Sequence, residues 1–165
     1  MTTLTQTAPT ARPAFSPKLL AGGFVAGMVM GMWQMVLEAI LPNGGGFWSP
    51  LVYIAATIFR GFQTVTAPVP FDLLGVIAGL MGHMMNSIIF GLIFAGFIAP
   101  RTRTLMGKVI AGIVYGVIIY AVMWLAVVPI FDPVMLRLNA PVFFLGHMMF
   151  GAALGLVSHW MAEKA

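Results

Sequence analysis

The sequence of 165 residues contains no cysteine and very few charged side chains. The absence of cysteine excludes disulfide bonds, thiolate metal sites and cysteine-held iron–sulfur clusters. Charged residues make up 7% of the chain, whereas a typical soluble domain has about 25%. The chain therefore has too few charges to cover a surface that faces water. Serine-hydrolase, zinc-protease and phosphate-loop motifs are also missing, so we expect a protein that is not an enzyme.

Hydrophobic residues make up 61% of the chain and gather in runs that are long enough to cross a bilayer, which takes about 20 residues. We predict an all-α integral membrane protein with four transmembrane helices in one domain, residues 18–165. A flexible tail, residues 1–17, precedes it and is rich in threonine, proline and alanine. The predicted spans are residues 19–41, 71–99, 105–130 and 141–161, and prolines lie near most of their ends.

A shorter apolar segment lies between the first two spans, after the sequence NGGGFWSP. Residues 50–61 are too few to cross a bilayer as a helix. Trp48 and Tyr53 have amphipathic rings of the kind that settle at the level of lipid headgroups. We therefore predict a short interfacial helix over residues 50–61.

Basic residues are distributed unequally between the two sides of the predicted membrane domain. Six of them flank the N-terminus, the loop between spans two and three, and the C-terminus, whereas the other two loops hold only Arg60 and Arg137. This bias predicts cytoplasmic N- and C-termini in a bacterial inner membrane. The flanking distribution also argues against a nucleic-acid-binding patch. The six residues are Arg12, Lys18, Arg101, Arg103, Lys108 and Lys164.

The chain repeats itself at low similarity. VAGMVMG at residues 25–31 matches IAGIVYG at residues 110–116, and GHMMNSIIFGL at residues 82–92 matches GHMMFGAALGL at residues 146–156. The offsets are 85 and 64 residues, so the first half contains 21 extra residues between its two spans. We predict two tandem hairpins that form a parallel repeat about an axis along the membrane normal.

Such an axis would bring His83 and His147, one from each copy, to a similar depth. Small and polar residues share one face of each predicted span, as the interior of a membrane bundle requires. We therefore expect a polar cavity in the outer half of the bundle. Its candidate lining residues are Gln34, Glu38, His83, Asn86, Tyr120 and His147.

Two cofactor hypotheses follow from the histidines. His83 and His147 are candidate axial ligands of a single b-type haem, because facing helices of a bundle can supply two imidazoles to one iron. A copper site is the second hypothesis, because soft thioethers and imidazoles suit Cu(I). Its candidate methionines are Met28, Met32 and Met35 of the first span, and Met84, Met85, Met148 and Met149 beside the histidines.

Proton-coupled transport is a further alternative, in which Glu38, Asp72 and His83 relay protons. The simplest interpretation of all these groups is a hydrogen-bonded network that fixes the packing of the helices. Methionine in particular is a common gap-filler in apolar interiors.

Several short motifs resemble a group of small, uncharacterised bacterial four-span membrane proteins. The matching stretches are GFWSP, AGLMGHMMNSIIFGLIFA and GHMMFGAALGL, within residues 20–157. They contain a Gly-x-Trp-x-Pro loop (Gly46, Trp48 and Pro50) and a His-Met-x-x-Ser-x-x-Phe-Gly helix (His83, Met84, Ser87, Phe90 and Gly91). The resemblance implies a bacterial membrane protein and transfers no activity or site residue.

Because the predicted loops are short, the function should lie within the bilayer or at an interface with another membrane protein. We expect a non-catalytic accessory or complex subunit of the membrane. Its expected partners are membrane lipid and either further copies of itself or other membrane subunits.

Overall fold

The computed structural model describes residues 17–163, and no β-strand occurs in this part of the chain. Four helical segments are long and apolar enough to cross a membrane: Leu20–Ile40, Leu73–Arg101, Leu105–Phe131 and Ala140–Ala162. The prediction of an all-helical protein with four membrane-spanning helices is confirmed. The predicted N-terminal tail, apart from Pro17, lies outside the described residues.

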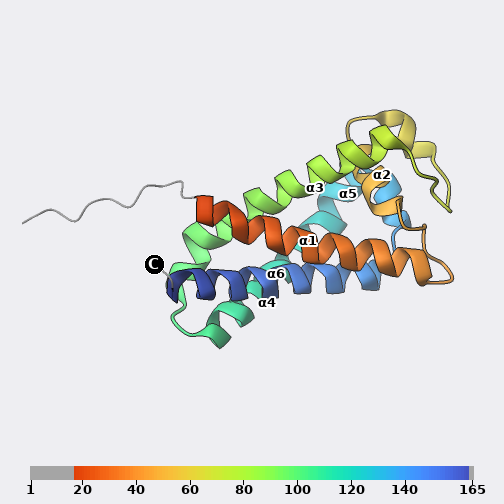
Figure 1. Cartoon of the computed structure of the whole chain (residues 1–165). Helices are drawn as coiled ribbons and strands as arrows, with labels where there is room; N and C mark the ends of the chain where they lie inside the picture. Colours follow the sequence, from red (N-terminus) through yellow and green to blue (C-terminus); the bar gives the residue numbers. More distant parts are fainter. Residues whose placement is uncertain (1–16, 164–165) are drawn as a thin grey trace, which may run out of the picture.

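Shorter helical turns lengthen or connect the main helices (Figure 1). In chain order the elements are α1 (Pro17–Ile40), α2 (Ser49–Ala55), η1 (Arg60–Thr64), α3 (Leu73–Ile93), η2 (Phe94–Ile98), η3 (Ala99–Arg101), α4 (Leu105–Val122), η4 (Met123–Val127), α5 (Val128–Phe131), η5 (Pro133–Arg137) and α6 (Ala140–Glu163).

Local sequence explains where the outer helices start and where they change pitch. The Asp72 carboxylate accepts a hydrogen bond from the Gly75 N–H, and the Thr104 hydroxyl accepts one from the Gly107 N–H, so α3 and α4 each begin with an N-cap. The wide π-turns η2 and η4 come just before Pro100 and Pro129. A proline removes one helical hydrogen bond and crowds the preceding turn, so the helix widens there.

The four long helices form a row in the order α3, α1, α6, α4, with α1 and α6 at its centre. Glycines allow the neighbouring backbones to touch. A Cβ atom at Gly112 would overlap the carbonyl oxygen of Gly151, and one at Gly116 would overlap that of His147. This close approach of small residues is the usual basis of helix association in lipid.

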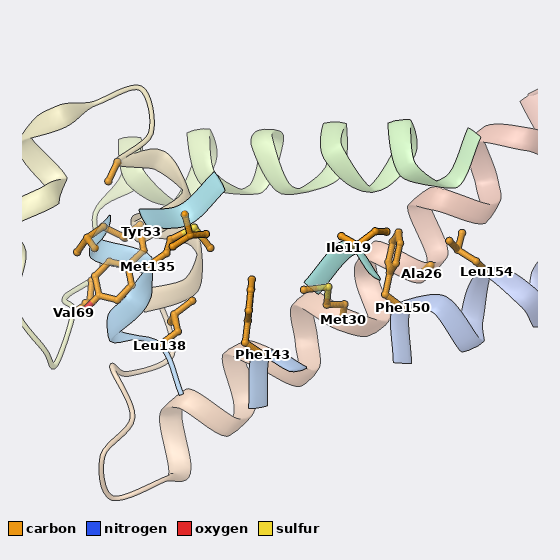
Figure 2. Close-up of a cluster of buried hydrophobic side chains, with 14 of the residues drawn as sticks. Ala26, Met30, Tyr53, Val69, Ile119, Met135, Leu138, Phe143, Phe150 and Leu154 are labelled. Carbon is orange, nitrogen blue, oxygen red and sulfur yellow. The ribbon is translucent and has the colours of Figure 1, made fainter. Parts of the chain in front are cut away.

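At the end of the bundle where α1 stops and α6 begins, the short elements α2, η1 and η5 form a cap. The short helix α2 is buried along most of its length and packs against α3. Figure 2 shows Tyr53 of α2 beside Val69, Met135 and Leu138, at one end of a hydrophobic cluster that continues through Phe143 to Met30 and Phe150. The helix ends at Ala55 rather than at residue 61, because the chain turns there and Thr57 reaches Asp132.

Candidate functional site

A cavity of about 160 Å³ lies between α3 on one side and α4, η4 and α5 on the other. Helices α1 and α6 form its floor through Met30, Phe143 and Phe150, and most of its wall is apolar. Its polar lining residues are Thr57, His83, Asn86, Ser87, Asp132 and His147. The structure therefore brings both histidines, which lie far apart in the sequence, to one cavity.

The cavity exists because α3 and α4 do not pack along their length. At one end the two segments are joined by a hydrogen bond of 3.0 Å from the Tyr115 hydroxyl to the Phe90 carbonyl oxygen. The rings of Phe94 and Tyr115 also meet there, with centroids 5.7 Å apart. At the other end the cap separates the helices. The cavity between these two ends is only partly enclosed.

His83 reaches from α3 to the backbone of α1. Its Nε2 lies 2.9 Å from the carbonyl oxygen of Gly27. Because a carbonyl oxygen can only accept, Nε2 carries the proton and donates. Gly31 leaves room for the ring, since a Cβ atom at that position would lie 3.1 Å from Nε2. The glycine stripe of α1 thus fixes the orientation of this imidazole.

His147 on α6 is buried, with 4% of its surface exposed. Its Nδ1 lies 2.9 Å from the Phe143 carbonyl oxygen one turn earlier in the same helix, so Nδ1 donates. Aromatic rings hold the imidazole from the sides: the Phe143 centroid is 4.5 Å away and the Tyr120 centroid 5.9 Å away. Tyr120 therefore supports His147 but is not part of the cavity wall.

Glu38 and Gln34 lie beside the cavity rather than in it. The Glu38 carboxylate is fully buried and accepts hydrogen bonds from Gln34 Nε2 (3.2 Å), the Gly45 N–H (2.8 Å) and the Asn139 N–H (2.7 Å). It joins the end of α1 to the glycine-rich loop and to the start of α6. Gln34 lines a second cavity of about 20 Å³, which it shares with His83.

Asp132 is a cavity residue that was not among the candidates from the sequence. It follows α5 and is 3% exposed, and its carboxylate accepts hydrogen bonds from the Thr57 hydroxyl (2.7 Å) and from the Gln63 amide. Loss of hydration on burial raises the pKa of Asp132, although both hydrogen bonds and the positive charge of Arg60 oppose the rise. In the sequence, the position of this acidic residue between Pro129 and Pro133, at the end of a span, could have identified it as a site residue.

The methionines suggested as copper ligands differ in position, and of these Met35 lines the second cavity together with His83. Met28, Met32 and Met85 are exposed on the outside of the bundle. Other methionines line the cavity instead: Met30, Met123 and Met135. Within residues 17–163 there is no group of three histidine, aspartate or glutamate side chains arranged to hold a metal ion.

The size of the cavity decides which organic groups it can accept. An engineered apolar cavity of about 150 Å³ holds one benzene ring, and the cavity here has about 160 Å³. A haem, with four pyrrole rings around its iron, needs far more room. The proton on Nε2 of His83 is also engaged by a carbonyl oxygen. The enclosed volume therefore matches a single six-membered ring and is smaller than a haem.

No family model, curated protein or solved structure matches the chain. The function has to be inferred from the site.

Proposed function

We propose that the protein is a non-catalytic membrane subunit that binds a small, lipid-soluble ligand with one ring. The observation that carries the proposal is the cavity between α3 and α4, which has apolar walls and holds His83, Asn86 and His147. A ligand pocket typically combines apolar walls with a few polar groups that fix orientation. Because α3 and α4 do not pack there, a ligand dissolved in the bilayer can enter from the side.

The orientation that we propose places the cap at the outer face of a bacterial cytoplasmic membrane. The beginning of α1 and the end of α6 lie at the same end of the bundle (Figure 1). The Lys108 ammonium donates to the Ser158 carbonyl oxygen at that end. This end is the more basic one, which favours the cytoplasmic side. At the other end, Trp48 packs edge-on against Phe71, which suits a position near the headgroups.

The bundle is built, we propose, from two copies of one helical hairpin: α1 with α3, and α4 with α6. The glycine contacts support this proposal, because the close contacts of one hairpin recur in the other at the sequence offsets of 85 and 64 residues. The corresponding pairs are Gly23–Gly91 with Lys108–Gly155, Gly27–Ser87 with Gly112–Gly151, and Gly31–His83 with Gly116–His147.

A cavity-filling variant tests the proposed binding function. Ile119 lines the cavity and is 6% exposed, whereas its neighbour Ile118 is 55% exposed on the outside of α4. Butylbenzene, added to the protein in lipid nanodiscs, should raise the unfolding temperature of the unsubstituted chain and of Ile118→Trp. A ligand at 100 times its Kd stabilises the folded state by about 2.7 kcal/mol.

The Ile119→Trp variant should lose this stabilisation because the indole occupies the ligand's place. If Ile119→Trp does not fold, Ile119→Phe, which adds less volume, replaces it in the test. An equal rise in all variants would mean that butylbenzene acts through the lipid. No rise in the unsubstituted chain would mean that the cavity binds no single-ring ligand, and either result would refute the proposed function.

A further inference from the structure

We propose that the ligand is a lipid-soluble para-hydroquinone, held in its reduced form by His83 and His147. This inference rests on the proposed function, and it names the chemical class that the polar atoms of the cavity select. The decisive feature is that backbone carbonyl groups fix the proton of each imidazole.

Each histidine has one nitrogen engaged and one left over. Nε2 of His83 donates to the Gly27 carbonyl oxygen, and Nδ1 of His147 donates to the Phe143 carbonyl oxygen. An uncharged imidazole has one donor and one acceptor nitrogen, so Nδ1 of His83 and Nε2 of His147 are acceptors. Neither of these atoms has a hydrogen-bond partner among residues 17–163. Both rings therefore offer a cavity ligand an acceptor only.

A neutral state of both rings follows from their surroundings. Charge in an apolar interior is costly unless it is paired, and no carboxylate bonds to either ring in the described part of the chain. The one carboxylate in the cavity wall, Asp132, is engaged by Thr57 and Gln63. Asp132 in its ionised form is also an acceptor, so it favours the same kind of ligand.

The complementary ligand must therefore donate hydrogen bonds. A ketone oxygen would face a lone pair at each histidine and would leave both nitrogens unpaired. A hydroxyl group would donate to them. The Asn86 amide and the Ser87 hydroxyl can each donate and accept, so they do not discriminate. Acceptor nitrogens from two different helices fit a molecule with two hydroxyl groups, and the cavity volume limits that molecule to one ring.

The route into the cavity explains why the ligand should carry a tail. The side between α3 and α4 would face the hydrocarbon region, because both segments are long and apolar enough to cross a membrane and carry exposed apolar residues such as Met85 and Val122. A ring with an alkyl or isoprenoid chain can place its ring beside the histidines while the chain stays in the lipid. A water-soluble diol would gain nothing from this entrance.

A series of four probes tests the inference in lipid nanodiscs: 2-decyl-1,4-hydroquinone, the corresponding quinone, the dimethyl ether of the hydroquinone, and decylbenzene. Dithionite keeps the hydroquinone reduced and is left out of the quinone sample, which it would convert to the hydroquinone. It cannot alter the protein through thiols because the chain has no cysteine. We expect the hydroquinone to bind roughly tenfold more tightly than the quinone or the ether, since each lacks both donors.

Variants of His83 and His147 test whether these residues cause the preference for hydroquinone. His83→Phe and His147→Phe should each reduce the preference for hydroquinone over quinone several-fold. His159→Phe, on the same helix as His147 but not in the cavity wall, should retain the full preference. Stabilisation by decylbenzene, which needs no histidine, reports that the cavity of each variant is still formed.

The outcomes separate this inference from the proposed function. If all four probes bind equally well and Ile119→Trp abolishes binding, the cavity accepts single rings but does not select hydroquinones, and only this inference fails. Tighter binding of the quinone would also overturn it. If no probe binds, the proposed function fails together with the inference.

Discussion

Replacement of Glu38 should destabilise the protein strongly without affecting ligand binding in the variants that still fold. The carboxylate accepts from two backbone N–H groups, those of Gly45 and Asn139, and from the Gln34 amide. Each buried N–H that loses its partner costs about 1–3 kcal/mol, and bonds to a charged acceptor lie at the upper end of that range. Glu38→Ala should therefore lower the free energy of unfolding by about 3–6 kcal/mol.

Graded variants make the expectation quantitative. Glu38→Gln keeps one acceptor oxygen, but its amide nitrogen must face a backbone donor, so we expect about half of the loss. Asp72→Asn is the matched control, because asparagine caps a helix about as well as aspartate and the change should be nearly neutral.

The assay is thermal unfolding in detergent micelles, followed by circular dichroism. For a chain of this size, a loss of about 4 kcal/mol lowers the unfolding temperature by roughly 8–16 °C. A Glu38→Gln protein with unchanged stability would refute the assignment of Glu38 as a structural cross-link. It would also revive the alternative that Glu38 carries protons during transport.

Two further expectations concern the helix contacts and the cap. Gly112→Ala should destabilise the bundle by about 1–3 kcal/mol because its Cβ overlaps the Gly151 carbonyl oxygen, whereas Gly96→Ala, which meets nothing within 4 Å, should be neutral in the same unfolding assay. The pKa of Asp132 is raised in the folded state from an ordinary value of 3.8. The cap should therefore be most stable below that value and should lose stability as the pH rises through the folded-state pKa. The hydrogen-exchange protection factors of residues 56–66, which correct for the pH dependence of chemical exchange, should follow this trend and become independent of pH over that window in Asp132→Asn.

The helical architecture was predictable because its signals are local. Four long apolar runs, few charges and prolines at the boundaries are sufficient to predict four spans. The approach of His83 and His147 to one cavity was expected from the matching GHMM stretches, and both residues do line it. The repeat itself remains a proposal, supported by equivalent glycine contacts.

The details of the site were not predictable because they depend on loops that have no counterpart elsewhere in the chain. Glu38 belongs to the polar stripe of α1, but the loop of Gly44, Gly45 and Gly46 folds back over the end of that helix and surrounds the carboxylate. Gly46 has a φ of +93°, a conformation that favours glycine and allows this reversal. Asp132 is held at the cavity by hydrogen bonds from Thr57 and Gln63, which lie far from it in the sequence.

The position of α2 explains why the cavity exists at all. If the two hairpins were arranged with full symmetry, α3 would meet α4 as α6 meets α1. Gly82 and Gly146 are equivalent in the proposed repeat, but Gly146 faces Met30 and Trp33 of α1, whereas Gly82 faces Ile54 of α2. The 21 extra residues of the first hairpin thus supply a short helix that takes the place of α4 on α3.

Gly79 is a residue that allows α2 to pack on α3 in the place of α4. Gly79 touches the Leu51 carbonyl group of α2, and a side chain at this position would displace that helix. In the proposed repeat its equivalent, 64 residues later, is Phe143, whose ring packs against His147 and lines the cavity. One copy therefore uses a glycine to admit α2, and the other uses a phenylalanine to support a histidine. In the proposed repeat, divergence at this pair of positions accompanies the 21 extra residues that supply α2, and together they distinguish the packed interface of α1 and α6 from the open site between α3 and α4.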